Sequence, residues 1–311
     1  MKANPASAYN LVTVLGPTAG GKTSFAAHLA DRLNGEVISA DSRQVYRHMN
    51  LGTGKDYDDY TVQGRYVPFH LVDVAEPGIH YNVFEYQRDF INAFRDITAR
   101  GRFPVLCGGS GLYINAAIRG YRLIPVPANE KLREALSSKS LEELTTLLAS
   151  MKKLHNLTDV DTKDRAIRAI EIEMAYHEQG IEADDYPVLR NLCLGIRFER
   201  SAERKRITER LHARLAAGMV EEVKALLDRG LTAENLVYYG LEYKYITHYI
   251  LGKLRYESMV EQLNIAIHQF AKRQMTWFRK MEREGTVIHW IAGELKLEEK
   301  LEIALGLFNG K

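Results

Sequence analysis

The first 120 residues alternate short apolar runs with longer stretches of helical periodicity. Apolar runs occupy residues 11–15, 36–40 and 104–107, and helical patterns occupy residues 24–33 and 82–100. Short buried strands separated by helices are typical of a parallel sheet with helices on both faces, and such sheets bind ligands at the carboxyl ends of their strands. We therefore predict an α/β fold with its ligand site at that edge of the sheet.

The pattern changes between residues 121 and 190. Pro125 and Pro127 interrupt it, and three helical stretches follow at residues 129–136, 141–153 and 164–179. The later elements are a strand at 191–198, helices at 201–217, 220–230, 259–284 and 295–308, and a strand at 286–291. We interpret residues 121–190 as a helical insertion domain, and residues 1–120 and 191–311 as one α/β core with C-terminal helices.

A glycine-rich loop lies between the first predicted strand and the first predicted helix. It reads Gly-Pro-Thr-Ala-Gly-Gly-Lys-Thr, the pattern of a phosphate-binding P-loop, whose N–H groups and following helix surround an anion. The predicted ligands of a diphosphate or triphosphate are Gly16, Pro17, Thr18, Ala19, Gly20, Gly21, Lys22 and Thr23. The Thr23 hydroxyl is also expected to face Mg²⁺. The flanking strand and helix disfavour the alternative of a glycine-rich surface turn, and the core is predicted to be P-loop NTPase-like.

Two further features follow predicted strands. Asp41 is placed to act as a base, although an Asp-Ser pair is also ordinary capping material. Residues 108–111 read Gly-Gly-Ser-Gly, where a Walker-type ATPase usually has an acidic Mg²⁺ ligand; residues 70–73 are a short alternative source of an acid. The glycine loop suits the close approach of a flat ligand, and equally a tight strand-to-helix turn. We expect the P-loop, Asp41 and this loop to meet in one crevice.

One predicted helix carries a row of arginines. Arg206, Arg210 and Arg214 recur at four-residue spacing, which places them on one face. They could be a row of anion ligands, or a solvated face with Glu-to-Arg pairs.

A second predicted helix mixes cations with aromatic rings. Residues 272–280 read Lys-Arg-Gln-Met-Thr-Trp-Phe-Arg-Lys, and such a mixture suits splayed RNA. We assign Lys272 and Arg273 to RNA, and the rings of Trp277 and Phe278 to the core.

The overall composition excludes few partners. The 42 basic and 40 acidic residues give a net charge of +2, so nucleic-acid binding would have to come from local clusters.

Cys107 and Cys193 lie in separate apolar runs and are predicted to be reduced core residues. No apolar run approaches about 18 residues and the N-terminus lacks a signal-peptide pattern, so a cytoplasmic protein without membrane contact is expected.

Taken together, these segments resemble the tRNA dimethylallyltransferase family, also called tRNA isopentenyltransferases. The resemblance is carried by residues 16–23, 39–46, 52–55, 70–74, 108–113, 164–168 and 271–279. It implies transfer of a dimethylallyl group from its diphosphate to N6 of adenosine 37 of tRNA, beside the anticodon. The P-loop would then hold a leaving diphosphate, which accounts for the missing acid after the third strand.

The resemblance also implies roles for individual residues. Asp41 would be the base that takes the N6 proton, and Thr18 would bond the departing oxygen. Arg210, with Lys22 and Thr23, would neutralise the diphosphate. Mg²⁺ would be the cofactor, and adenosine 37 would flip out of its stack to reach the site.

Positions that contact tRNA in the family fall on both parts of this chain. They correspond to Asp41, Ser42, Arg43, Gln44, Ser110, Arg133, Asp164, Arg165, Ala166, Ile167 and Arg168. The implied partners are the tRNA anticodon stem-loop and dimethylallyl diphosphate, bound by a monomer. Three positions depart from the family: Ser110 replaces the usual Thr, His268 stands where Arg is common, and residues 239–244 read Tyr-Gly-Leu-Glu-Tyr-Lys instead of Gly-Tyr-Arg/Lys-Gln.

Three other functions remain open at this point. An adenylate isopentenyltransferase would share the P-loop and Asp41, but it has less need of the basic stretch or the insertion. A small-molecule P-loop kinase would need an acidic Mg²⁺ ligand after the third strand and an arginine-bearing lid. A non-catalytic RNA-binding module would not need the set Thr18, Lys22 and Asp41.

Overall fold

The computed structural model describes residues 8–121, 123, 125–152, 158–179 and 186–310. The chain divides into two compact units, one formed by Met1–Tyr121 with Pro187–Lys311 and the other by Arg122–Tyr186. These boundaries lie close to those that the sequence predicts for the core and the insertion. None of the helices in the described part of the chain combines the length and apolar character that a membrane crossing requires.

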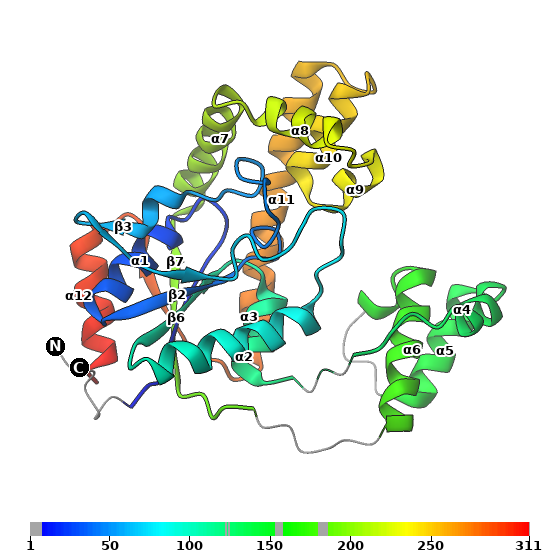
Figure 1. Ribbon diagram of the computed structural model, residues 1–311, viewed down its shortest axis with the longest axis horizontal. Coiled ribbons are helices and arrows are strands. Elements are labelled where there is room, and N and C mark those ends of the chain that lie inside the picture. Colours follow the sequence, from blue (N-terminus) through cyan, green and yellow to red (C-terminus); the bar gives the residue numbers. More distant parts are fainter. Residues whose placement is uncertain (1–7, 122, 124, 153–157, 180–185, 311) are drawn as a thin grey trace. The chain divides into compact units, whose positions relative to one another are not determined.

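A six-stranded parallel sheet forms the centre of the larger unit (Figure 1). Its strand order is β5-β2-β6-β1-β7-β8. The strands are β1 (Leu11–Leu15), β2 (Gly35–Ala40), β5 (Phe69–His70), β6 (Phe103–Gly108), β7 (Asn191–Arg197) and β8 (Ile288–Ala292). The first strand is central, with Leu15 opposite Gly108 on one side and Gly195 on the other. The predicted parallel α/β fold is confirmed, and the carboxyl ends of β1, β2 and β6 lie at one edge.

Helices cover both faces of this sheet (Figure 1). One face is covered by α1 (Lys22–Arg32) and α12 (Leu297–Phe308), and the other by α2 (Val83–Ala99), α3 (Gly111–Arg119) and the long α11 (Tyr256–Arg283). Apolar side chains of the strands, α1 and α12 form one continuous buried cluster, which supplies the main stabilising burial on that face. The second helix begins where predicted because Asn82 and Glu85 form a reciprocal capping box.

The remaining elements of this unit belong neither to the six-stranded sheet nor to the helices named above. They are the 3-10 turn η1 (Tyr57–Tyr60), the hairpin strands β3 (Thr61–Val62) and β4 (Arg65–Tyr66), and the helices α7 (Arg200–Ala216), α8 (Met219–Asp228), α9 (Ala233–Tyr238) and α10 (Leu241–Ile250). The sequence does not predict α3, α9 or α10, which are short; α3 directly follows β6, and α10 follows α9 after a brief turn. The two helices α9 and α10 contact each other, and α10 also contacts α11.

The insertion has a small core of its own. Its elements are α4 (Glu130–Ser137), α5 (Leu141–Met151), the 3-10 turn η2 (Thr158–Val160) and α6 (Lys163–Gln179). Leu136, Leu144, Leu148 and Ile170 are among the side chains buried between these helices. Side chains of Asn129 and Ser140 cap α4 and α5, so the three predicted helices are confirmed; residue 153, at the predicted end of the second, lies outside the described residues.

Candidate active site

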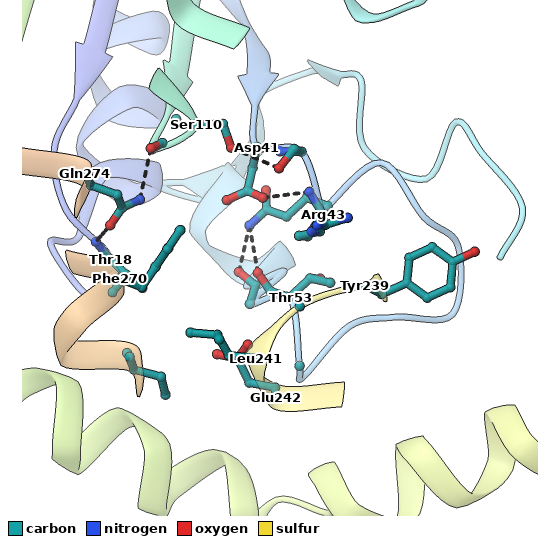
Figure 2. A pocket seen from close by; sticks show the side chains of 18 of the residues that line it. Thr18, Asp41, Arg43, Thr53, Ser110, Tyr239, Leu241, Glu242, Phe270 and Gln274 are labelled. Carbon is teal, nitrogen blue, oxygen red and sulfur yellow. Dashed lines mark hydrogen bonds between the residues drawn. The ribbon is translucent and has the colours of Figure 1, made fainter. Parts of the chain in front are cut away.

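A cavity of about 580 Å³ opens at the carboxyl edge of the sheet. Thr18, Lys22 and Thr23 of the P-loop line it together with Asp41 and the residues after β6. Figure 2 shows Thr18, Asp41 and Ser110 converging on this space from three different strand ends. The predicted meeting of the three loops in one crevice is confirmed, and the volume lies in the range of small-molecule sites.

The P-loop has a backbone that glycine permits. Gly16 has φ 156°, and a β-carbon there would lie 2.5 Å from the Ile196 carbonyl oxygen. Gly21 precedes α1 in a left-handed conformation, with φ 66°. The Lys22 ammonium donates to the Pro17 carbonyl at 2.6 Å, so it lies over the loop. The start of α1 and the ammonium are thus aimed at the same place, as anion binding requires.

Burial lowers the pKa of Lys22 to about 8. If the loop binds diphosphate as the sequence predicts, an ammonium that titrates near this pH would give that binding a defined pH dependence. Affinity is expected to fall above pH 8 by up to about tenfold per pH unit, because binding must then take up a proton. Titration calorimetry with inorganic diphosphate between pH 7 and pH 9.5 would measure it. Lys22→Arg, whose guanidinium stays charged, is the control and should lack this decline.

Loss of folding stability at high pH through Lys22 would not explain such a decline in diphosphate affinity. The folded pKa of Lys22 lies below its ordinary value of 10.5, so the unfolded chain binds more protons between pH 8 and 10.5. The contribution of Lys22 to stability therefore rises with pH across this window. An equally steep decline for Lys22→Arg would contradict the assignment of Lys22 as the titrating phosphate ligand.

One side chain of α11 joins the P-loop to the loop after β6. The Gln274 side-chain oxygen accepts from the Thr18 backbone N–H at 2.8 Å, and its amide nitrogen donates to the Gly109 carbonyl at 2.9 Å. Figure 2 shows Gln274 between these two loops. Gln274 belongs to the basic stretch that carries the resemblance, but nothing in the sequence predicts this bridging role.

The glycines after β6 line the cavity and also lie close against side chains of α11. A β-carbon on Gly109 would lie 2.4 Å from Nε2 of Gln274, and one on Gly111 would lie 2.1 Å from Cδ1 of Trp277. Side chains of α11 therefore pack against these two glycines, a contact that neither of the two alternatives left open by the sequence includes. The assignment of Trp277 to the core is wrong because its ring lines the cavity, whereas Phe278 is fully buried as predicted.

Asp41 stands at the end of β2 and serves in part as a cap. One of its carboxylate oxygens accepts from the Arg43 backbone N–H at 2.9 Å, while the residue also lines the cavity. The Ser42 backbone N–H donates to the Ser110 hydroxyl at 3.0 Å, which ties the two strand ends together. Because the cap uses a single oxygen, the carboxylate can cap the turn and still present an acceptor to the cavity.

Two neighbours of Asp41 hold the rim of the cavity. The Arg43 guanidinium lies 5.0 Å from the centre of the Tyr238 ring. The Gln44 side chain donates to the Gly54 carbonyl at 2.9 Å, so this predicted tRNA contact is engaged with its own chain. The segment 239–244 also contributes to the wall, where Glu242 faces the cavity and burial raises its pKa (Figure 2).

The three arginines of α7 divide into two roles. The Arg206 side chain donates to the Ala19 carbonyl at 3.0 Å and supports the P-loop from outside. Arg210 and Arg214 line the cavity and pair with Asp56. The row is therefore neither a uniform set of anion ligands nor a solvated face with Glu-to-Arg pairs. Arg206 hydrogen-bonds the P-loop, and Arg210 and Arg214 line the cavity.

The other acidic candidate does not reach this cavity. Asp73 forms an ion pair with the buried ammonium of Lys55 and accepts from the Tyr57 hydroxyl. Among the described residues no cluster of three His, Cys, Asp or Glu side chains could hold a metal ion. P-loop proteins bind Mg²⁺ mainly through phosphate oxygens and water, with one hydroxyl from the chain, and Thr23 lies where it could supply that hydroxyl.

The remaining predicted tRNA contacts have mixed positions. Lys272 is exposed and Arg273 lines the cavity. In the insertion, Asp164 and Arg165 are exposed, and Arg165 pairs with Asp161 one turn earlier.

Four of the predicted tRNA contacts in the insertion are engaged within its own structure. Ala166 and Ile167 are buried in its core, because they occupy the inward face of α6, so their side chains are not available to tRNA. Arg133 and Arg168 both pair with the buried carboxylate of Glu171, at 2.8 Å and 3.0 Å. Both arginines are therefore structural ion-pair partners, and their side chains remain about 40% exposed, so contact with tRNA stays a prediction for them.

Glu171 organises the helices of the insertion. Burial alone would raise its pKa, but bonds from Arg133, the Asn129 N–H and Arg168 outweigh burial and lower the pKa to about 2. Glu171→Gln is expected to reduce the stability of the insertion by about 3 kcal/mol at pH 7, measured by hydrogen exchange of its helix amides. The exposed Glu134→Gln on α4 is the matched control.

The pH dependence of that loss has a defined sign. A carboxylate whose folded pKa is lowered stabilises the fold above its ordinary pKa of 4.5, and that contribution disappears as pH falls toward 2. The difference between wild type and Glu171→Gln should therefore shrink with acidification. A difference that stayed constant would show that the ion pairs are not its source.

Fold and site together define a P-loop protein in which a phosphate loop faces a carboxylate and two arginines across one cavity. The chain belongs to the IPP transferase family. The model of that family matches residues 44–281, and a model described as isopentenyl transferase matches residues 9–67.

Relatives with similar sequences cover nearly the whole chain. A protein named tRNA dimethylallyltransferase 2 from Phocaeicola vulgatus is 56% identical, over 97% of this chain and 99% of its own length. One of the same name from Bacteroides fragilis is 59% identical, over 94% of this chain and 96% of its own. The crystal structure of a full-length tRNA isopentenylpyrophosphate transferase from Bacillus halodurans has a TM-score of 0.71 and 31% identity, covering 97% of this chain and 96% of that one.

Proposed function

We propose that this protein transfers a dimethylallyl group from dimethylallyl diphosphate to N6 of adenosine 37 in tRNA and releases diphosphate. The observation that carries the proposal is the single cavity in which the P-loop, Asp41 and Arg210 meet. Relatives at 56% and 59% identity bear the name of this activity. A kinase is disfavoured, since β6 is followed by glycines packed against α11 instead of an acid.

The chemistry follows from the charges around the cavity. A bond forms between N6 and the allylic carbon while the carbon–oxygen bond to the diphosphate breaks, and its electron pair leaves with that oxygen. The N6 lone pair is delocalised into adenine, so Asp41 takes the N6 proton as the new bond forms. Lys22 and Arg210 stabilise the negative charge growing on the diphosphate, and Thr18 donates to the departing oxygen. When bound, Mg²⁺ supplies further positive charge to the diphosphate, with Thr23 as its ligand from the chain.

The acceptor has to reach the cavity as a single unstacked base. Extrusion from an anticodon loop costs less than from a duplex, so the anticodon stem-loop is the fitting substrate. At the rim, Arg43, Tyr238 and Arg273 provide cations and a ring suited to phosphate and base contacts. Exposed Asp164 and Arg165 are the residues by which the insertion would contact tRNA, and the protein is proposed to act as a monomer.

The proposal is tested by offering both classes of acceptor to the purified protein. Labelled dimethylallyl diphosphate is incubated with an anticodon stem-loop RNA, the same RNA carrying guanosine at position 37, or AMP. Label should enter only the adenosine-37 RNA. Label in AMP and none in RNA would instead identify an adenylate isopentenyltransferase.

A further inference from the structure

Arg210, the proposed diphosphate ligand, is held by an acidic residue of its own chain. Its Nη2 lies 2.9 Å from a carboxylate oxygen of Asp56, the residue just before η1. One helical turn further along α7, Arg214 donates to both oxygens of the same carboxylate, at 3.3 Å and 3.2 Å. Two cations at the edge of the cavity therefore share one anion.

The loop before Asp56 is shaped to accept this pair of arginines. Gly54 has φ 77°, and a β-carbon there would lie 2.6 Å from both terminal nitrogens of Arg214 and 2.7 Å from Nη2 of Arg210. Both guanidinium groups thus rest against bare backbone. The arrangement is specific, because a side chain at this position would push the arginines apart.

Arg210 and Arg214 differ in the free-energy cost of separation from Asp56. The Arg214 side chain is 15% exposed and that of Arg210 is 32% exposed. Burial lowers the pKa of Arg214, so separating it from its counter-ion is costly. Arg210 can leave at lower cost, because Asp56 remains neutralised by Arg214 after it has gone.

We propose that Asp56 and Arg214 form a resting dock from which Arg210 exchanges onto the diphosphate of the donor and returns when diphosphate is released. Asp56 and Arg214 are then positioning residues that act through Arg210. The inference rests on the proposed function, because it takes the donor diphosphate to be the competing anion. In this arrangement the Asp56 carboxylate and the diphosphate compete for Arg210, and this competition sets the affinity for diphosphate.

A double-mutant cycle tests this competition. The dissociation constant of inorganic diphosphate is measured by titration calorimetry for wild type, Asp56→Asn, Arg214→Gln and the double variant. Arg214→Gln should weaken binding about fivefold, because Asp56 then holds Arg210 alone. Asp56→Asn should tighten binding about fivefold, and its effect should be larger in the Arg214→Gln background. The KM for dimethylallyl diphosphate should follow these constants, while the KM for RNA stays unchanged.

Two controls separate the dock from a purely structural contact. Asp58→Asn removes a nearby exposed carboxylate that forms no described ion pair with either arginine, and it should leave diphosphate binding unchanged. Arg214→Lys keeps the cation and should bind diphosphate more tightly than Arg214→Gln.

The outcomes distinguish this inference from the proposed function. If wild type binds diphosphate and Asp56→Asn binds it no more tightly, the dock is refuted while the donor site stands. If wild type binds no diphosphate, the dock is refuted, and the transfer assay with labelled donor decides the proposed function separately. If Asp56→Asn only lowers the unfolding temperature and weakens binding, the pair is a structural latch.

Discussion

Asp41→Asn is expected to lower kcat for prenyl transfer about 1,000-fold, which corresponds to about 4 kcal/mol of transition-state stabilisation. Asparagine keeps the oxygen that accepts from the Arg43 N–H, so the turn after β2 survives. It cannot take a proton from N6. Single-turnover measurements at saturating donor and RNA would isolate the chemical step.

The binding of RNA provides the control for that variant. The dissociation constant for the anticodon stem-loop, measured by fluorescence anisotropy, should stay within about twofold of wild type, because Asp41 supplies one contact among many. Asp41→Ala removes the cap as well and should cost about 1 kcal/mol of stability in addition. If Asp41→Asn kept more than a tenth of the wild-type rate, Asp41 would be a cap and not a base.

Lys22→Met is expected to reduce kcat/KM for dimethylallyl diphosphate about 1,000-fold. The methionine retains the apolar stem but removes the charge that lies over the P-loop and faces the leaving group. Initial rates over a range of donor concentrations would give this value, and the KM for RNA should change little.

A cation remote from the cavity serves as the matched comparison. Lys205 on α7 is exposed and pairs with Glu209, so Lys205→Met removes the same charge without touching the site. Its kcat/KM should remain within about twofold of wild type. Equal losses in both lysine variants would point to a general effect of charge on RNA binding instead of a role for Lys22 at the diphosphate.

Structural features that depend on residues close together in the sequence can be predicted from local patterns. The alternation of buried strands and helices is sufficient to place β1, β2 and β6, and the P-loop pattern then locates the anion site between β1 and α1. The carboxyl-end rule adds Asp41 to that site, because parallel strands end at one edge. The helices of the insertion were predictable for the same reason, since each has its own apolar stripe and two have side-chain caps.

Contacts between distant segments could not be predicted in this way. The glycines at 109 and 111 are compatible with a ligand or with a tight strand-to-helix turn, and their contact with side chains of α11 is visible only in the structure. Helical periodicity places Trp277 in the core, because it does not distinguish a buried core from a cavity wall. Likewise, a pairing of Asp56 with arginines more than 150 residues away leaves no mark in either segment by itself.

The hydrogen bonds of Gln274 join segments that the ribosome makes at very different times. Residues 16–23 are synthesised early, yet the side chain that accepts from the Thr18 N–H is added only 256 residues after Thr18. Domains fold from the N-terminus during translation, so the sheet can assemble around an unfinished phosphate loop. Premature termination before residue 274 would leave a chain that carries the complete P-loop sequence without the side chain that accepts from the Thr18 N–H.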